Sequence, residues 1–180
     1  KVYVSNSGGL NQNNPDNTVS VINTETFTEI KRIEVGENPG TIHADVMGNI
    51  YIVSRGRYDE SSGDYDCHLH RIDSETDEVI TTYHLPVLSF TISGYKAYMY
   101  SYNSKQESIQ VMDTRTGQII DDNFVKDKTE FTHIYEIAVN PINEDVYICD
   151  AQNYTVNGSV VCFDKNGHYK FTIDAKGINP

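Results

Sequence analysis

The sequence predicts an all-β protein built from a repeated unit of four short antiparallel strands. Short segments of alternating apolar and polar residues, rich in β-branched and aromatic types, are separated by turns of Gly, Asn and Asp. These segments recur at a spacing of 47 to 49 residues. No stretch of helical length repeats its apolar residues with a period of 3.6.

A series of aromatic strands defines the repeat. Its members are KVYVSN (1–6), NIYIVS (49–54), KAYMYS (96–101) and DVYICD (145–150), whose tyrosines are separated by 48, 47 and 49 residues. A second series keeps the same register: VSVINTET (19–26), LHRIDSET (69–76), IQVMDTRT (109–116) and VVCFDKNG (160–167). The phrase GENP at 36–39 returns as GINP at 177–180, and Pro39 and Pro180 are 141 residues, or three repeats of 47, apart.

The second unit shows its four expected strands most clearly. They cover 41–46, 50–54, 68–73 and 78–85, with the turns MGN and SETD and a long polar loop after the second strand. Four antiparallel strands that repeat at this spacing are typical of a β-propeller blade.

We therefore expect residues 1–180 to form a β-propeller segment. The expected parts are blade strands in 1–40, blades in 41–85, 86–127 and 128–176, and the start of another blade at 177–180. Because the first blade lacks its inner strand, we predict a piece of a larger ring, of about seven or eight blades. The remaining blades are expected from the same polypeptide or from a second chain.

Composition excludes several classes of partner. The formal net charge of −12 argues against binding to nucleic acid or to an anionic membrane surface. No apolar run approaches the ~18–20 residues that a membrane-spanning helix needs. The three cysteines form no CxxC pair, which argues against a metal knuckle or a disulfide framework. Cys149 and Cys162 are expected on neighbouring strands, where buried thiols are favoured over a disulfide.

The long loops predict a binding face. Because blade strands alternate in direction, the loops after the second and fourth strands lie on one face, and binding residues concentrate on such loops. Aromatic rings with amide and guanidinium donors suit a sugar or a large planar molecule. The candidate ligand-binding residues are Arg55, Arg57, Tyr58, Tyr65, Tyr102, Asn103, Tyr135, Gln152, Asn153 and Tyr154, with His43, Phe131 and His133 nearer the axis.

Metal sites are weaker hypotheses. Asp59, Asp64 and Asp66 lie in an acidic loop that could offer oxygen ligands to calcium, but the loop lacks EF-hand spacing, and a solvated loop is favoured. His68 and His70 point to the same side of one strand, and a packed pair is favoured over a metal site because no third ligand is visible. We expect no cofactor, with calcium as the alternative.

No catalytic motif of the GxSxG, HExxH or phosphate-loop type is present. The expected inner strands supply only His43, Asp45, Glu136 and Asn140 as polar groups for a central channel, and some of these are expected in turns. The sequence therefore favours a protein that is not an enzyme.

Two segments resemble a known family most clearly: NTVSVINTETFTEIKRIEVGENPGTI (17–42) and ESIQVMDTRTGQII (107–120). They are similar to the YVTN family of propellers, which includes bacterial surface-layer-like and YncE-like proteins. The resemblance covers nearly the whole chain and is specific for fold but weak for function. It extends to secreted propellers of gut Bacteroidetes, many of them lipoproteins, and some of those resemble corrinoid-capturing surface propellers.

The resemblance alone implies a location at the cell envelope of a Gram-negative bacterium, in the periplasm or at the outer-membrane surface, with a leader outside this chain. The expected function is capture of a ligand by the long-loop face, without catalysis. That ligand is a glycan, a corrinoid-like nutrient or an envelope protein partner. Two alternatives stay open: a calcium-dependent propeller hydrolase such as a lactonase, with channel carboxylates, and a protein-interaction scaffold.

Overall fold

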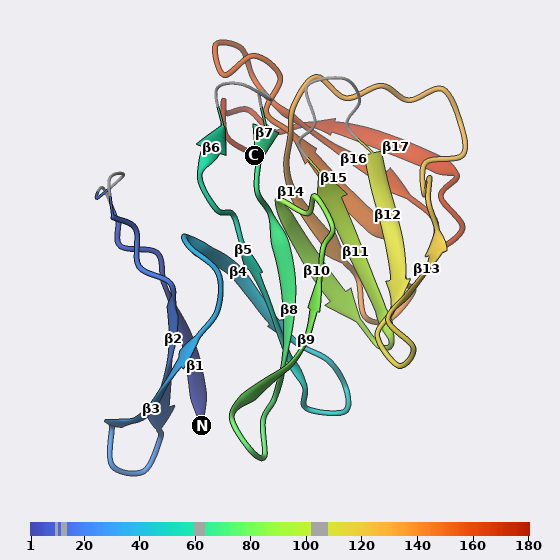
Figure 1. The fold of residues 1–180 in the computed structure, drawn as a ribbon. Coiled ribbons are helices and arrows are strands. Elements are labelled where there is room, and N and C mark those ends of the chain that lie inside the picture. Colours follow the sequence, from blue (N-terminus) through green and yellow to red (C-terminus); the bar gives the residue numbers. More distant parts are fainter. Residues whose placement is uncertain (10, 12–13, 60–63, 102–107) are drawn as a thin grey trace. The chain divides into compact units, whose positions relative to one another are not determined.

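The computed structural model describes residues 1–180 except 10, 12–13, 60–63 and 102–107, and the described part is built of strands, turns and irregular segments (Figure 1). The strands are β1 (Val2–Asn6), β2 (Thr18–Asn23), β3 (Thr28–Glu34), β4 (Pro39–Ala44), β5 (Ile50–Ser54), β6 (Tyr58–Asp59), β7 (Asp64–Tyr65), β8 (His68–Asp73), β9 (Glu78–Tyr83), β10 (Ser89–Ser93), β11 (Lys96–Ser101), β12 (Ser108–Asp113), β13 (Gln118–Asp121), β14 (Ile134–Val139), β15 (Val146–Asp150), β16 (Ser159–Phe163) and β17 (Tyr169–Asp174). Among the described residues, no helix is long and apolar enough to cross a membrane.

The strands form four successive antiparallel sheets. Sheet 1 is β1-β2-β3, sheet 2 is β4-β5-β8-β9, sheet 3 is β10-β11-β12-β13, and sheet 4 is β14-β15-β16-β17. Strands β6 and β7 pair separately as a two-stranded hairpin. The all-β prediction is confirmed. The repeated tyrosines fall on β1, the first strand of the three-stranded sheet 1, and on β5, β11 and β15, the second strands of the four-stranded sheets.

The strand predicted at 41–46 instead runs from Pro39 to Ala44. The strand ends early because the side chain of Asp45 forms the following turn: its Oδ1 accepts hydrogen bonds from the backbone N–H groups of Met47 and Asn49. A carboxylate that captures local N–H groups in this way competes with the strand ladder. The predicted strands 50–54 and 68–73 agree with β5 and β8.

A polar side chain sets the next turn in every sheet. The side-chain oxygens of Asn23, Asp73, Asp113 and Asp164 each accept a hydrogen bond from the backbone N–H two residues further on. Each of these residues ends or directly follows the third strand of its repeat unit. Asn and Asp favour such turns because their short side chains replace a backbone acceptor. The second repeated series therefore encodes strand and turn together.

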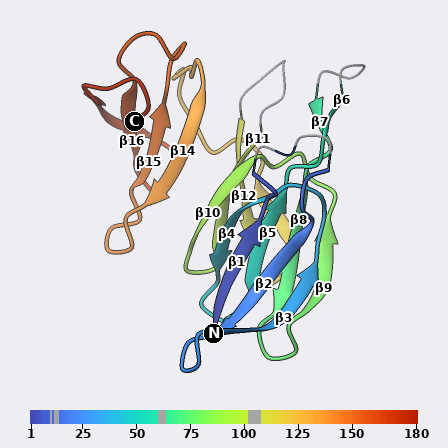
Figure 2. The same cartoon turned by 90° about the vertical axis from the view of Figure 1, so that its left-hand side faces the viewer.

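The chain divides into two compact units, residues 1–89 and residues 90–180. In the first unit, β1 and β4 lie side by side (Figure 2). Sheets 1 and 2 share an aliphatic core of Val19, Val21, Ile33, Ile50, Ile52 and Ile72. At the edge of this core, Asp77 accepts hydrogen bonds from Lys1 Nζ and the Tyr3 hydroxyl, which link β1 to the turn between β8 and β9.

In the second unit, aromatic rings join sheets 3 and 4. The ring of Phe124 lies 5.4 Å from that of Tyr98 on β11 and 6.3 Å from that of Phe163 on β16, centroid to centroid. The backbone N–H of Lys126 donates to the carbonyl of Gly167 in the turn between β16 and β17. The segment after β13 therefore packs between the two sheets.

Gly167→Ala should destabilise the protein by more than the about 1–2 kcal/mol that a left-handed conformation costs a non-glycine residue. Gly167 has φ 82°, and a Cβ there would overlap the carbonyl oxygen of Phe124. Gly94→Ala is the matched control, because Gly94 has φ 59° but an added Cβ meets no atom within 4 Å. Urea unfolding of both variants measures the difference. Equal losses of stability would contradict the close packing at Gly167.

Candidate functional site

The first unit has a pocket at the end of sheet 2 where the long loop after β5 lies. At this end the chain leaves β5 at Ser54, enters β8 at His68 and leaves β9 toward His84. The pocket has a volume of about 620 Å³ and is lined by Val35, Gly36, Glu37, Ser54, Gly56, Arg57, Asp66, His68, His70, Thr82 and His84. We call it the histidine pocket. Of the predicted binding residues, it contains Arg57.

His70 forms the floor of the histidine pocket. It is 6% exposed, and its Nε2 lies 2.8 Å from Ser54 Oγ while its Nδ1 lies 3.0 Å from Thr82 Oγ1. Burial, followed by the nearby His68 and His84, lowers the pKa of His70 to about 4. The ring is therefore neutral near pH 7, and it donates to one hydroxyl while it accepts from the other.

Two further imidazoles stand beside His70. The rings of His68 and His70 are 6.3 Å apart and stacked, and the ring of His84 meets that of His68 edge-on at 4.7 Å. The predicted pairing of His68 with His70 is thus present. His84 was not among the predicted residues, although the register signals it: Leu69 pairs with Tyr83, so the residue after β9 comes opposite His68.

The wall of the histidine pocket holds a fixed ion pair. Arg57 donates from Nε to Glu37 Oε2 at 2.7 Å and from Nη2 to Glu37 Oε1 at 2.8 Å. These hydrogen bonds lower the pKa of Glu37 and raise that of Arg57, and both groups stay charged. Gly36 packs closely against Ser54, because a Cβ added at Gly36 would overlap the side chain of Ser54. The wall therefore offers a charged donor and a charged acceptor.

The predicted polar loop after β5 contains the hairpin β6–β7, in which Tyr58 pairs with Tyr65 and Asp59 with Asp64. The sequence predicts a long polar loop here without a strand pair. The two-stranded ladder satisfies backbone groups that a loop would leave to water. The side chains of Tyr58, Asp59 and Asp64 lie outside the described part of the structure. Asp66 is described and lines the histidine pocket.

Arg55, a predicted binding residue, lies beside the pocket rather than in its lining. A Cβ added at Gly40 would lie 3.1 Å from its Nε, so the guanidinium passes close over β4. That Nε is buried and has no hydrogen-bond partner among the residues that the structure describes.

No group of three His, Cys, Asp or Glu side chains is placed to hold a metal ion in the described ranges. The imidazole nitrogens of His70 instead face hydroxyls. The arrangement is suited to hydrogen bonding of a polar molecule.

The second unit contains a separate aromatic cluster, formed by the rings of His133, Tyr135 and Tyr154. The ring of Tyr154 lies 5.0 Å from that of His133 and 6.3 Å from that of Tyr135, both edge-on. Tyr135 and Tyr154 are exposed, and both were predicted binding residues. Such rings offer apolar faces for stacking.

A buried carboxylate, Asp150, holds the loop under this cluster. It accepts hydrogen bonds from the backbone N–H groups of Thr132, His133 and Gln152 and from Gln152 Nε2. Gln152 and Tyr154 have positive φ angles of 54° and 59°. This backbone conformation is costly for residues other than glycine and persists only where surrounding contacts hold it in place. Asp150 was not among the predicted residues, because as the last residue of a strand it gives no motif of its own.

Other predicted residues have structural roles. Gln152 bonds to Asp150 and Thr132, and Asn153 accepts from the N–H and hydroxyl of Thr155. Asn140 accepts from the N–H of Ile142, so Asn140, like Asp45, forms a turn. Phe131 packs near Phe163, with ring centroids 6.2 Å apart. Tyr102 and Asn103 lie outside the described residues.

The cysteines are free thiols. Cys149 on β15 faces Val160, and Cys162 on β16 faces Tyr147, so the two thiols are diagonal and not directly opposite. Burial is the largest cause of the raised pKa of each thiol. They therefore have the character of packed, protonated side chains.

Four consecutive antiparallel sheets with a loop-end pocket define the chain as an all-β repeat protein. No family model and no curated protein matches the chain. A solved structure that it resembles is described as a crystal structure of the eukaryotic initiation factor, with 13% sequence identity and a TM-score of 0.46. The match covers 75% of this chain and 32% of that chain, so this chain spans about a third of that structure's length. A likeness of this degree carries no functional argument.

Proposed function

We propose that this protein captures a glycan, without catalysis, in the histidine pocket. The observation that carries the proposal is the convergence of a buried neutral imidazole, two hydroxyls and the Arg57–Glu37 pair on one pocket. Sugar hydroxyl groups both donate and accept. A neutral His70 uses both ring nitrogens on the hydroxyls of Ser54 and Thr82, which orients those hydroxyls and leaves their remaining hydrogen-bonding capacity for a sugar. Small sets of precisely placed polar groups are what orient ligands in protein pockets.

The aromatic cluster of the second unit supports the same ligand class. Sugar rings stack their C–H faces on exposed aromatic rings, and such rings are presented by Tyr135 on β14 and by Tyr154 on the loop after β15, which Asp150 fixes. A fixed loop costs less conformational entropy when a ligand binds than a mobile one.

The wider architecture is part of the proposal. Successive sheets of the repeat support β-propeller blades, and we infer a ring of about seven or eight of them. A location at the cell envelope rests on the resemblance to the YVTN family. With that location, a glycan, a corrinoid-like nutrient or an envelope protein is the ligand to be tested, and the pocket chemistry favours the glycan.

Arg57→Ala should weaken glycan binding about tenfold or more, because it removes a charged donor and releases Glu37. Calorimetry with soluble oligosaccharides from plant and bacterial polysaccharides, and with cyanocobalamin, measures this. Arg115→Ala is the matched control: its guanidinium is 56% exposed against 54% for Arg57 and is also paired with a carboxylate, that of Asp113.

Equal losses of affinity in the two variants would contradict the role of the histidine pocket. Binding of cyanocobalamin in the absence of any oligosaccharide binding would replace the glycan by a corrinoid.

A further inference from the structure

The second unit has a small pocket at the end of sheets 3 and 4 where the turns β10–β11 and β14–β15 lie. Its volume of about 330 Å³ is at the lower end of the range for sites that bind small molecules. We call it the turn pocket. Both sheets contribute to its lining, which includes Tyr95, Lys96, Tyr98, Ile120, Pro141 and Glu144.

Tyr98 brings an unpaired hydroxyl to the turn pocket. The residue is 1% exposed, and its hydroxyl makes no hydrogen bond in the described part of the protein. Two repeat equivalents do have partners: the hydroxyl of Tyr3 donates to Asp77 at 2.5 Å, and that of Tyr147 is hydrogen-bonded to Cys162. The Tyr98 hydroxyl is not sealed inside the protein, so it faces the open space of the pocket that Tyr98 lines.

Two charged groups of the turn pocket, Lys96 and Glu144, form no ion pair with any residue that the structure describes. Lys96 and Tyr98 are two residues apart on β11, so their side chains point to the same side of sheet 3. Asp113 opposes Lys96 in the ladder, but its carboxylate accepts hydrogen bonds from Nε and Nη2 of Arg115 instead. The pocket therefore presents an ammonium group and a carboxylate that no side chain neutralises.

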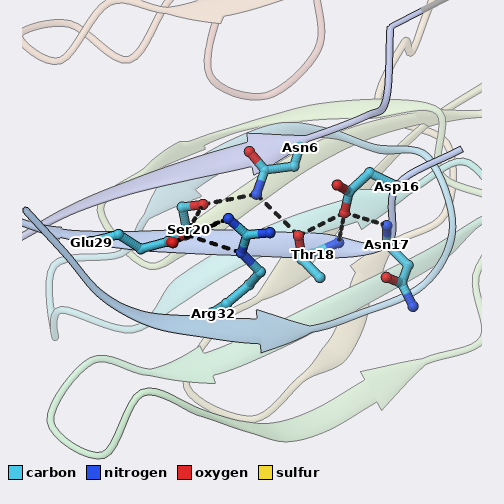
Figure 3. A network of polar contacts seen from close by, with 7 residues as sticks. All are labelled: Asn6, Asp16, Asn17, Thr18, Ser20, Glu29 and Arg32. Carbon is cyan, nitrogen blue, oxygen red and sulfur yellow. Dashed lines mark hydrogen bonds and ion pairs between the residues drawn. The ribbon is translucent and has the colours of Figure 1, made fainter.

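A clustered set of polar groups in sheet 1 shows the contrary case (Figure 3). Asn6 donates to the hydroxyls of Thr18 and Ser20. Glu29 accepts from Ser20 and from Nε and Nη2 of Arg32. These groups satisfy one another and need no ligand. Because buried polar groups in proteins almost always have a partner, the unpaired hydroxyl of the turn pocket indicates that a ligand supplies one.

Apolar side chains stand beside these polar groups. Tyr95 and Ile120 are 43% and 55% exposed, and Pro141 lines the pocket with them. The guanidinium carbon of Arg115 lies 4.7 Å from the centroid of the Tyr95 ring, a cation–π contact that holds this ring in place. A ligand with an apolar group can therefore remove apolar surface from water here.

We propose that the turn pocket binds a free α-amino acid with an apolar side chain. Lys96 pairs with the carboxylate of the amino acid, Glu144 pairs with its ammonium group, and the Tyr98 hydroxyl donates to the same carboxylate. Hydrogen bonds between charged groups are the strong ones, and a zwitterion makes them at both ends. The side chain of the ligand contacts Tyr95 and Ile120. Burial, followed by the charge of Glu144, raises the pKa of Tyr98 to about 12, so the hydroxyl keeps its proton and remains a donor.

Calorimetry with L-leucine and L-phenylalanine tests the proposal, together with two analogues that each lack one charge. L-leucinamide lacks the carboxylate and N-acetyl-L-leucine lacks the ammonium group, so each should bind about tenfold or more weakly than L-leucine. Glycine keeps both charges but has no apolar side chain, and it should also bind more weakly than L-leucine. The turn pocket shares no residue with the histidine pocket, so this result is independent of glycan capture.

Two charge-removing variants assign the two ends of the ligand. Glu144→Gln should weaken binding of L-leucine about tenfold and should no longer distinguish it from N-acetyl-L-leucine. Lys96→Gln should weaken it similarly and should no longer distinguish it from L-leucinamide. Tyr98→Phe, which removes only the hydroxyl, should cost about three- to tenfold. The matched controls are Glu75→Gln and Lys165→Gln, in the turns β8–β9 and β16–β17, and both should bind as the parent does.

Three results would overturn the proposal. One is no heat of binding for either amino acid at concentrations up to about 10 mM, which corresponds to negligible affinity. Another is a parent protein that binds both analogues as tightly as L-leucine, because the ligand would then not be recognised as a zwitterion. The third is an affinity for L-leucine that Glu144→Gln and Lys96→Gln both leave unchanged.

Discussion

Phe124→Ala is expected to lower the free energy of unfolding by about 3–5 kcal/mol, the usual cost of removing a buried phenylalanine ring. Phe124 is 2% exposed and contacts an aromatic ring of sheet 3 on one side and one of sheet 4 on the other. Its loss leaves a cavity that neither sheet can fill without moving. Urea unfolding followed by circular dichroism gives the magnitude.

Phe27→Ala is the control for this change, because Phe27 is 84% exposed in a turn. It should alter the free energy of unfolding by less than about 0.5 kcal/mol. If the Phe124 and Phe27 variants have the same stability, the ring of Phe124 does not join the two sheets.

Acidification should destabilise the protein through His70. The pKa of His70 is about 4 in the folded protein against an ordinary 6.5, so between these values the unfolded chain binds more protons. Stability is therefore highest above pH 6.5 and falls as the pH falls toward 4, by on the order of 3 kcal/mol from this residue. Burial, His68 and His84 cause the shift.

His70→Asn removes this titration, so unfolding by urea at pH 7, 6, 5 and 4 should show a smaller loss of stability in the variant than in the parent. His168→Asn is the control, because the side chain of His168 is 67% exposed. Carboxylates whose pKa is lowered, such as Asp113 at about 2, add their own acid sensitivity in all three proteins at lower pH. If the parent and the His70 variant lose the same free energy of unfolding between pH 7 and pH 4, His70 accepts a proton as readily in the folded protein as in the unfolded chain. That result would contradict the lowered pKa of His70.

Much of the fold follows from local sequence patterns and could be predicted. The alternation around Tyr51 and Tyr98 identifies β5 and β11. The Asp or Asn that ends or directly follows the third strand of each repeat unit marks a turn that its own side chain forms. Strand ends were less predictable. Asp45 shortens β4 through hydrogen bonds to its own turn, and composition alone does not separate that role from a channel carboxylate.

The candidate site was less predictable than the fold. His84 reaches His68 only through the register of β8 and β9, which a bulge between Arg71 and Ile72 shifts. Asp150 acts by binding backbone N–H groups of a distant segment, and sequence spacing carries no information on that contact. By contrast, Tyr135 and Tyr154 were predicted because binding residues concentrate on long loops over a rigid scaffold, although the structure places Tyr135 in β14.

Within each sheet, the strands lie side by side in the order in which they occur along the chain, and this order has a consequence for folding and for the evolution of the repeat. Each sheet is complete within a single stretch of fewer than 50 residues, so its hydrogen bonds need no distant part of the chain. Stability in such arrays is approximately a sum over modules and the contacts between neighbours. Duplication of one such stretch in the gene adds a whole module with a ready-made neighbour contact, and nascent sheets can form one after another as the chain leaves the ribosome.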